Sequence, residues 1–218
     1  MPEVTLYTYF RSSCSARLRI ALHLKGIDFT PVFVNLLQNE QSSPAHKAIN
    51  PSGLVPALIV KRDTAPPVTI TQSLAALEYL DEAFPNQGPA LLPQVQTQGR
   101  KCELWRPSSL PVTNLKILRR VAPLGADRTT WSKDLIVEGL QAYEATVKRS
   151  AGKFSVGDQI TMADLCLIPA AWGAERVGVD LTAFPVTYVI IQNLEKEEAV
   201  NKGHWKTQPD TPEDLRAE

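Results

Sequence analysis

Reactive side chains are concentrated in one short segment near the start of the chain. Residues Arg11–Ser15 read R-S-S-C-S, which places hydroxyls beside a thiol. Before this segment, Val4–Tyr9 alternates β-branched and aromatic residues in the pattern of a strand. After it, Leu18, Ala21 and Leu22 recur at the three- and four-residue intervals of a helix. The segment therefore begins a helix, where free backbone N–H groups and the positive end of the helix dipole favour an anion.

This helix start has three interpretations. A serine at such a position caps the helix by accepting a hydrogen bond from a backbone N–H group, with no ligand involved. In the second interpretation, Cys14 is a nucleophile activated by the helix end. In the third, a serine hydroxyl donates a hydrogen bond to the thiolate of a bound thiol cofactor. The segment by itself does not choose among them.

Composition and charge exclude several classes of protein. The 218 residues carry 23 basic and 23 acidic side chains, so no overall field attracts nucleic acid or an anionic membrane. Cys14, Cys102 and Cys166 are far apart and form no C-x-x-C pair, a pattern typical of a reducing compartment and of neither a disulfide framework nor a zinc site. The first residues show no signal-peptide pattern, and the apolar run Leu165–Ala174 is too short to cross a bilayer. We expect a soluble, cytoplasmic protein without metal, nucleic-acid or membrane partners.

The order of predicted elements indicates two domains. Residues 1–84 alternate strands and helices in the order β-α-β-α-β-β-α, which makes a small mixed sheet covered by helices. Residues 85–93 are dense in Pro, Gly, Asn and Gln and are predicted to form a linker. Residues 94–218 show helical patterns, including a predicted capping pair of Thr161 and Asp164. The expected fold class is an α/β domain followed by an all-α domain.

Two further features of the first domain suit a ligand with peptide character. Val55-Pro56 stands directly before the apolar strand Ala57–Val60. A cis bond between Val55 and Pro56 would turn the N–H and C=O groups of Val55 outward to pair with an extended peptide, although a trans bond is the commoner form. Gln72-Ser73 opens an amphipathic helix, whose N-terminus offers donors to a second anionic group.

Together these motifs resemble the thioredoxin-like domain of the cytosolic glutathione transferases. The run Ser12–Leu22, S-S-C-S-A-R-L-R-I-A-L, resembles the signature of the zeta class of that family. The resemblance extends over nearly the whole chain, out to residues 208–216. It implies a thioredoxin-like glutathione-binding domain over residues 1–84, a helical substrate-binding domain over residues 94–218, and a homodimer.

The resemblance also implies a set of site residues. Ser12, Ser13, Cys14 and Arg176 are the catalytic candidates. Glutathione would lie along the Val55 backbone, with its γ-glutamyl carboxylate at the helix start of Gln72 and Ser73. The full set of glutathione-binding candidates is Ser12, Ser13, Cys14, Ser15, Arg17, Gln41, Val55, Pro56, Gln72, Ser73 and Asn114.

The activity implied by the resemblance is the glutathione-dependent cis–trans isomerisation of maleylacetoacetate to fumarylacetoacetate, with transfer of glutathione to small haloacids. The glutathione thiolate would add to the cis double bond, and rotation followed by expulsion would give the trans product. A general glutathione transferase and a monothiol redox enzyme that uses Cys14 are alternatives. A catalytically weak binding module of the same fold is a third.

Arg176 and two departures from the family pattern bear on substrate binding. An arginine after an apolar run is usually a solvated residue at a helix end. The resemblance instead implies that Arg176 contacts the carboxylate of the substrate, which the planar fork of a guanidinium can bind with two hydrogen bonds. Lys116, Arg119 and Arg120 form a second cationic cluster. Ala16 stands where zeta enzymes usually carry tryptophan, and the stretch Leu104–Leu110 contains Pro107 where the family has an unbroken helix.

Overall fold

A computed structural model describes residues 2–92, 122–125 and 127–216. The chain divides into two compact units, one formed by Met1–Leu91 with Glu198–Glu218 and the other by Leu92–Glu197. Three predictions fall outside the described residues: the role of Asn114, the cationic cluster of Lys116, Arg119 and Arg120, and the irregular stretch Leu104–Leu110.

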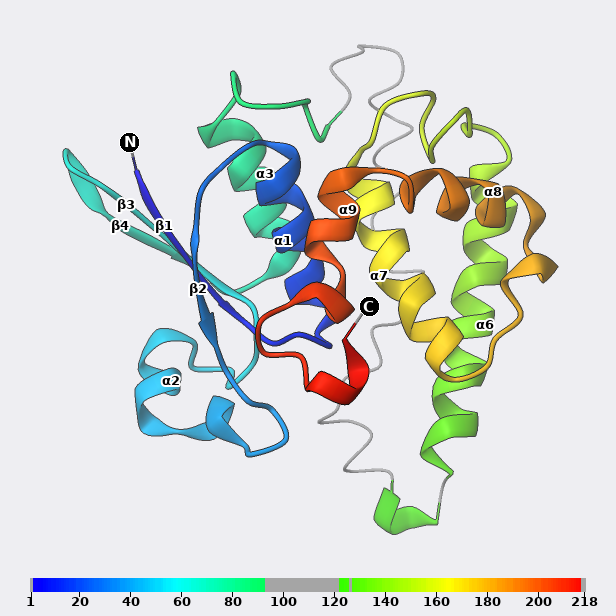
Figure 1. The fold of residues 1–218 in the computed structure, drawn as a ribbon, viewed down its shortest axis with the longest axis horizontal. Coiled ribbons are helices and arrows are strands. Elements are labelled where there is room, and N and C mark those ends of the chain that lie inside the picture. Colours follow the sequence, from blue (N-terminus) through cyan, green and yellow to red (C-terminus); the bar gives the residue numbers. More distant parts are fainter. Residues whose placement is uncertain (1, 93–121, 126, 217–218) are drawn as a thin grey trace. The chain divides into compact units, whose positions relative to one another are not determined.

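The first unit is built on a mixed four-stranded sheet (Figure 1). Its strands are β1 (Glu3–Thr8), β2 (Thr30–Phe33), β3 (Ala57–Arg62) and β4 (Ala65–Ile70), in the order β2-β1-β3-β4. β1 runs parallel to β2 and antiparallel to β3, and β3 runs antiparallel to β4. β4 begins earlier than predicted and contains Pro66 and Pro67, which lack an N–H donor and are tolerated because β4 is an edge strand.

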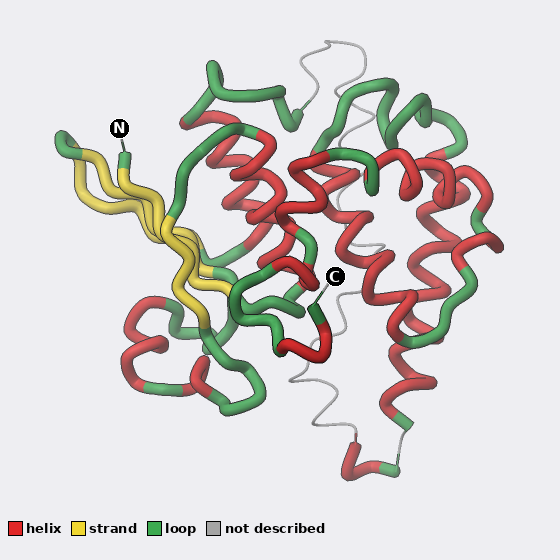
Figure 2. Tube along the Cα trace, viewed as in Figure 1, coloured by secondary structure: helices red, strands yellow, loops and turns green. Residues whose placement is uncertain are grey.

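Three helices complete the predicted β-α-β-α-β-β-α order, and this part of the fold prediction is confirmed. They are α1 (Ser13–Leu24), α2 (Pro44–Ile49) and α3 (Ser73–Ala83). α1 and α3 pack against each other beside the sheet, and Figure 2 shows the strands as one twisted layer next to them. The apolar positions of α1 and α3, such as Leu18, Leu22 and Leu77, are fully buried and form the core of the unit.

The end of the chain belongs to this first unit. α9 (Glu198–Gly203) packs against α1, and two 3-10 turns, Trp205–Thr207 and Glu213–Leu215, follow it. A Cβ atom at Gly203 would lie 2.4 Å from Cγ1 of Ile20 and 3.0 Å from its backbone N, so the helices approach closely only because Gly203 has no side chain. The sequence pattern predicts that residues 198–218 belong to the helical domain. The contact between α1 and α9 joins residues far apart in the chain, so it leaves no local pattern.

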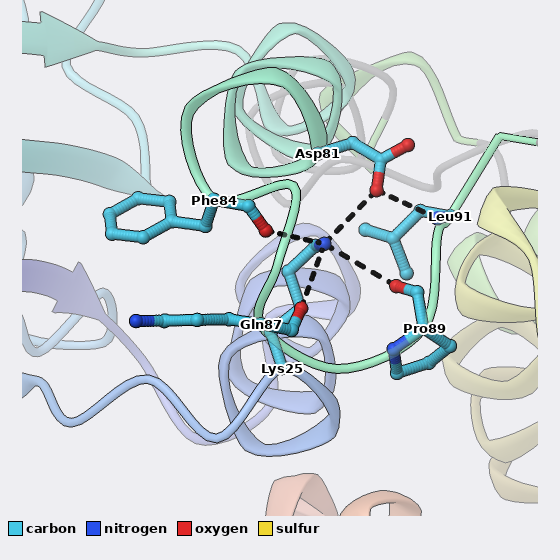
Figure 3. A network of polar contacts seen from close by, with 6 residues as sticks. All are labelled: Lys25, Asp81, Phe84, Gln87, Pro89 and Leu91. Carbon is cyan, nitrogen blue, oxygen red and sulfur yellow. Dashed lines mark hydrogen bonds and ion pairs between the residues drawn. The ribbon is translucent and has the colours of Figure 1, made fainter.

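A buried ammonium ties the start of the predicted linker to the same unit. Lys25 follows α1, is 3% exposed, and lies 3.0 Å from Oδ1 of Asp81 in α3. Figure 3 shows its Nζ surrounded by oxygens, which include three backbone carbonyls, those of Phe84, Gln87 and Pro89. The same Asp81 oxygen accepts a hydrogen bond from the N–H of Leu91 at 2.8 Å. Residues 85–91 are therefore bound to α1 and α3, and the first of the two segments that make up the unit extends to Leu91.

The second unit is helical. Its described helices are α6 (Arg128–Val147), α7 (Met162–Arg176) and α8 (Pro185–Leu194), with 3-10 turns at Ala122–Leu124 and Leu181–Ala183. α6 contacts both α7 and α8, and α7 is the most deeply buried of the three. No helix in the described part of the chain is long and apolar enough to cross a membrane.

The predicted capping pair starts α7. Asp164 is fully buried, and its Oδ2 accepts hydrogen bonds from the N–H and hydroxyl of Thr161 at 2.8 and 2.9 Å. Its Oδ1 accepts from the N–H and hydroxyl of Ser155 at 2.9 and 2.5 Å. Burial raises the pKa of Asp164, and these four hydrogen bonds to the carboxylate oppose that rise. The pair has the structural role that its position predicted.

Candidate functional site

The strand register brings three predicted segments to one edge of the sheet. The ends of β1 and β4 both pair with the start of β3, since Tyr7 lies opposite Ala57 and Ile70 opposite Leu58. The segment that follows β1, the segment that precedes β3 and the segment that follows β4 therefore converge. They are Arg11–Ser15, Val55-Pro56 and Gln72-Ser73.

The helix start after β1 uses one serine as its cap. Ser12 is the N-cap of α1, and its Oγ accepts a hydrogen bond from the N–H of Ser15 at 3.2 Å. Ser12, Ser13 and Cys14 are half-buried, and the Cys14 thiol is free. Ser15 is completely buried, and its hydroxyl has no hydrogen-bond partner among the described residues. The capping interpretation therefore holds for Ser12, whose hydroxyl proton remains available to a ligand.

Arg17 connects this helix start to the start of α3. Its side chain is 4% exposed, and its Nη1 donates to Oγ of Ser73 at 3.3 Å. Nε of Arg17 is buried without a partner among the described residues. The side chain of Gln72, the N-cap residue of α3, accepts no hydrogen bond from the first turn of the helix. The first backbone N–H groups of α3 are therefore left without a capping side chain from Gln72. A cation, a hydroxyl and a helix N-terminus together suit a carboxylate.

Gln41 lies in the 3-10 turn Glu40–Ser42 before α2, close to the turn that leads into Val55. A Cβ atom at Gly53, where φ is +61°, would lie 3.1 Å from the backbone oxygen of Gln41, so the loop and the turn are in close contact. Nε2 of Gln41 donates to Oδ1 of Asn39 at 2.9 Å. Its Oε1 is buried and has no partner in the described part of the chain.

The Val55–Pro56 peptide bond is cis. The carbonyl of the preceding Leu54 is held by two buried side chains, since Nε2 of His46 and Nδ2 of Asn50 donate to it at 2.9 and 2.8 Å. Because a carbonyl only accepts, the His46 ring carries its proton on Nε2 in this contact. Neither His46 nor Asn50 is among the residues predicted for the site. Asn50 begins the segment N-P-S-G (residues 50–53), a composition typical of a turn, and this is the available signal.

Three candidate residues share a property that is unusual in a folded chain. Oγ of Ser15, Nε of Arg17 and Oε1 of Gln41 are buried polar atoms without partners among the described residues. Buried polar groups are nearly always hydrogen-bonded, so such atoms point to a ligand or to water. All three belong to the set predicted to bind glutathione, a tripeptide with polar groups along its whole length. The site therefore fits this cofactor.

The remaining candidates lie elsewhere. Arg176 is the last residue of α7 in the second unit, and it is exposed. Its role, like that of Asn114, stays a prediction. Ala16 is 2% exposed, so its small side chain is packed inside the first unit. Within the described residues, His, Cys, Asp and Glu form no group of three that could hold a metal ion.

Comparison with known proteins identifies the family of this chain. Residues 11–83 match the N-terminal domain of the glutathione S-transferases, and residues 133–198 match the C-terminal domain. The chain belongs to the glutathione S-transferase family.

Its similarities are to the zeta class within that family. The chain is 60% identical to the maleylacetoacetate isomerase maiA of Aspergillus fumigatus, over 99% of this chain and 96% of that protein. The structure of the maleylacetoacetate isomerase of Anaeromyxobacter dehalogenans with glutathione bound in its active site is 34% identical, with a TM-score of 0.86 over 97% of this chain and 99% of that one. A bacterial maleylpyruvate isomerase of the zeta class is also 34% identical, with a TM-score of 0.85 over 95% of this chain and 100% of that one.

Proposed function

We propose that this protein is a glutathione-dependent isomerase that converts maleylacetoacetate to fumarylacetoacetate. The observation that carries the proposal is the set of buried, unpartnered polar atoms on Ser15, Arg17 and Gln41, at the edge where the glutathione-binding segments converge. The names of the similar proteins supply the substrate class, a dicarboxylate whose cis double bond is conjugated with a carboxylate on one side and a ketone on the other.

The first unit is proposed to hold the two ends of the cofactor. Ser73 and the first N–H groups of α3 bind the γ-glutamyl carboxylate, and the buried charge of Arg17 stabilises it. Gln41 binds nearer the glycyl end. The backbone of Val55 pairs with the cysteinyl residue as an added strand would, because none of the backbone hydrogen bonds between described residues involves Val55.

Ser12 and Ser13 are proposed to stabilise the thiolate. When bound, glutathione supplies a thiolate that adds reversibly to the cis double bond, which permits rotation. Since Oγ of Ser12 accepts from the N–H of Ser15, its proton can be donated to sulfur. The N-terminus of α1 adds the positive end of its dipole at the same place. Arg176 is proposed to bind a substrate carboxylate and to stabilise the negative charge that develops in the enolate intermediate. Asn114 is proposed as a further contact to glutathione.

One set of variants separates this function from its alternatives. We expect Cys14→Ala to keep a large share of isomerase activity and Ser12→Ala and Ser13→Ala to lose most of it, because the nucleophile belongs to the cofactor. Wild type and variants are assayed with maleylacetoacetate, a small haloacid and a mixed disulfide of glutathione. If Cys14→Ala abolishes turnover while the serine variants remain active, Cys14 is the nucleophile and the protein is a monothiol redox enzyme. If no substrate reacts with wild type, the chain is a binding module.

We also propose that the protein is a cytoplasmic homodimer. Its free Cys14 thiol and buried Cys166 suit a reducing compartment. The dimer is what the family resemblance of the sequence implies. Light scattering of the purified protein measures the mass in solution, and cell fractionation measures the location.

A further inference from the structure

A second buried arginine of α1, Arg19, holds the turn of residues 9–12, which connects β1 to the start of α1. Arg19 is 1% exposed, and its guanidinium donates four hydrogen bonds. Nη1 donates to Oγ1 of Thr8 at 3.0 Å and to the carbonyl of Tyr9 at 3.2 Å, Nη2 to the carbonyl of Phe10 at 3.1 Å, and Nε to the carbonyl of Gly203 at 3.1 Å. The same side chain therefore contacts the end of β1, the turn and α9.

Asp210, near the end of the chain, holds the other side of this turn. Its Oδ2 accepts a hydrogen bond from the N–H of Phe10 at 2.9 Å. Its Oδ1 is buried and has no partner among the described residues. Burial lowers the pKa of Arg19 to about 10, and the field of Asp210 opposes that change, so Arg19 is charged at neutral pH.

These contacts fix one peptide plane. The carbonyl of Tyr9 and the N–H of Phe10 belong to the same planar peptide group. Arg19 binds its oxygen and Asp210 binds its nitrogen, so rotation of the plane would break both hydrogen bonds. The carbonyl of Tyr9 also accepts the N–H of Ser12 at 3.0 Å, which closes the turn. The position of Ser12 is therefore set by this peptide plane.

The segment that carries Asp210 is itself well supported. Nε2 of Gln208 donates to the carbonyls of Lys202 and His204 at 2.9 and 2.8 Å. Oγ1 of the buried Thr211 donates to the carbonyl of Trp205 at 2.5 Å. Asp210 lies between two residues that are held in this way, so its carboxylate is presented to Phe10 from a fixed backbone.

We propose that Asp210 and Arg19 are positioning residues that set the place of the Ser12 and Ser13 hydroxyls relative to the glutathione thiol. The inference rests on the proposed function and extends it to residues that do not touch the cofactor. In this proposal Asp210, from the segment 198–218, helps to position the catalytic serines of the first unit. The γ-glutamyl end of the site, held by Ser73 and Arg17, is independent of this turn.

The test measures the thiol pKa of bound glutathione from its ultraviolet thiolate absorbance across pH. Asp210→Ala removes the acceptor of the Phe10 N–H, and we expect the thiol pKa to rise by about half a unit to one unit, about a threefold to tenfold fall in the thiolate-to-thiol ratio at a given pH. Asp210→Asn keeps an oxygen in the same place and should restore most of the change. The dissociation constant of glutathione should change less than threefold in both variants, about 0.65 kcal/mol. If Asp210→Ala does not fold, Asp210→Ser replaces it.

Asp214→Ala, an exposed change in the same segment, is the matched control and should leave the thiol pKa unchanged. Hydrogen exchange of the Phe10 amide should accelerate in Asp210→Ala and not in the control. A lowered melting temperature with an unchanged thiol pKa would show a purely structural role and overturn the inference. A fall of the thiol pKa in both Asp210 variants would also overturn the inference. Such a fall would mean that Asp210 acts through its negative charge, whose loss stabilises the thiolate, and not through the hydrogen bond to Phe10. Absence of any thiolate in wild type would instead refute the proposed function, and this inference with it.

Discussion

The carboxylate site at the start of α3 offers the sharpest test of the proposed cofactor. Ser73 is 7% exposed, and its Oγ already accepts a hydrogen bond from Arg17, so its own proton is free to be donated to a ligand carboxylate. Ser73→Ala removes that donor. A hydrogen bond to a charged group contributes about 1.5–3 kcal/mol, so we expect the dissociation constant of glutathione to rise about tenfold to a hundredfold.

Isothermal calorimetry with two ligands locates the loss. Glutathione carries the γ-glutamyl carboxylate, and the dipeptide cysteinylglycine lacks it. Ser73→Ala should raise the dissociation constant of glutathione by the factor given above and leave the dissociation constant of the dipeptide nearly unchanged. Cys14→Ala should weaken glutathione less than Ser73→Ala does, because the thiol of Cys14 is not part of the carboxylate site.

Thr69→Ala, an exposed change on the neighbouring strand β4, is the control and should bind both ligands like wild type. Two results would refute the reasoning. Equal losses for glutathione and the dipeptide would mean that Ser73 does not meet the γ-glutamyl carboxylate. A larger loss of glutathione affinity in Cys14→Ala than in Ser73→Ala would mean that the thiol of Cys14 contributes more to binding than the carboxylate site does.

Three further changes test other parts of the molecule. Arg176→Ala should lower kcat/KM for maleylacetoacetate about tenfold to a hundredfold and spare a neutral aromatic electrophile, with partial recovery in Arg176→Lys; equal losses on both substrates would count against a carboxylate contact. Arg17→Met should raise the melting temperature of the ligand-free protein and weaken glutathione, because it removes a buried charge that has no carboxylate partner among the described residues; a lower melting temperature would contradict this. Burial lowers the pKa of His204 from its ordinary value of 6.5, and the charges of Lys206 and Arg19 add to that effect, so the pKa is about 4. The unfolded chain therefore binds a proton at a higher pH than the folded protein does. The contribution of His204 to the free energy of unfolding should be fully present above about pH 6.5 and should be lost as the pH falls toward 4. His204→Asn keeps an acceptor for the N–H of Lys206 and should remove about 1–2 kcal/mol of that pH dependence, after allowance for partial exposure; parallel stability curves for wild type and variant would refute the assignment.

The parts of the site that could be predicted from the sequence are those with a local signature. The serine cluster follows a strand and precedes a helix, so its place at a helix N-terminus follows from the pattern of the neighbouring residues. Gln72-Ser73 is visible for the same reason. The register that brings these two segments together depends on pairing between strands. It followed from the family resemblance and not from either segment alone.

The supporting residues could not be predicted because their contacts join distant positions. Arg19 and Gly203 are 184 residues apart, and Phe10 and Asp210 are 200 residues apart. Arg19 stands among Leu18, Ile20 and Ala21, all buried, so a charge inside an apolar run was the one available signal. Asp210 is surrounded by prolines and polar residues, a composition that resembles any surface loop. The same long-range contacts placed residues 198–218 with the first unit and not with the helical domain.

Three buried cations on α1 and its cap explain why the site is located at this helix. Lys25 is paired with Asp81 at 3.0 Å, and the charge of Arg19 is stabilised by Asp210. Among the described residues, no carboxylate lies within ion-pair distance of either arginine. Arg19 donates four hydrogen bonds and lies in the field of Asp210, whereas Arg17 donates to Ser73 and its Nε has no partner among the described residues. An isolated buried charge is costly, and each of the other two has a carboxylate from another segment of the first unit. Arg17 lies where the γ-glutamyl carboxylate is proposed to bind, so the cofactor would supply the one counter-charge that the described protein does not.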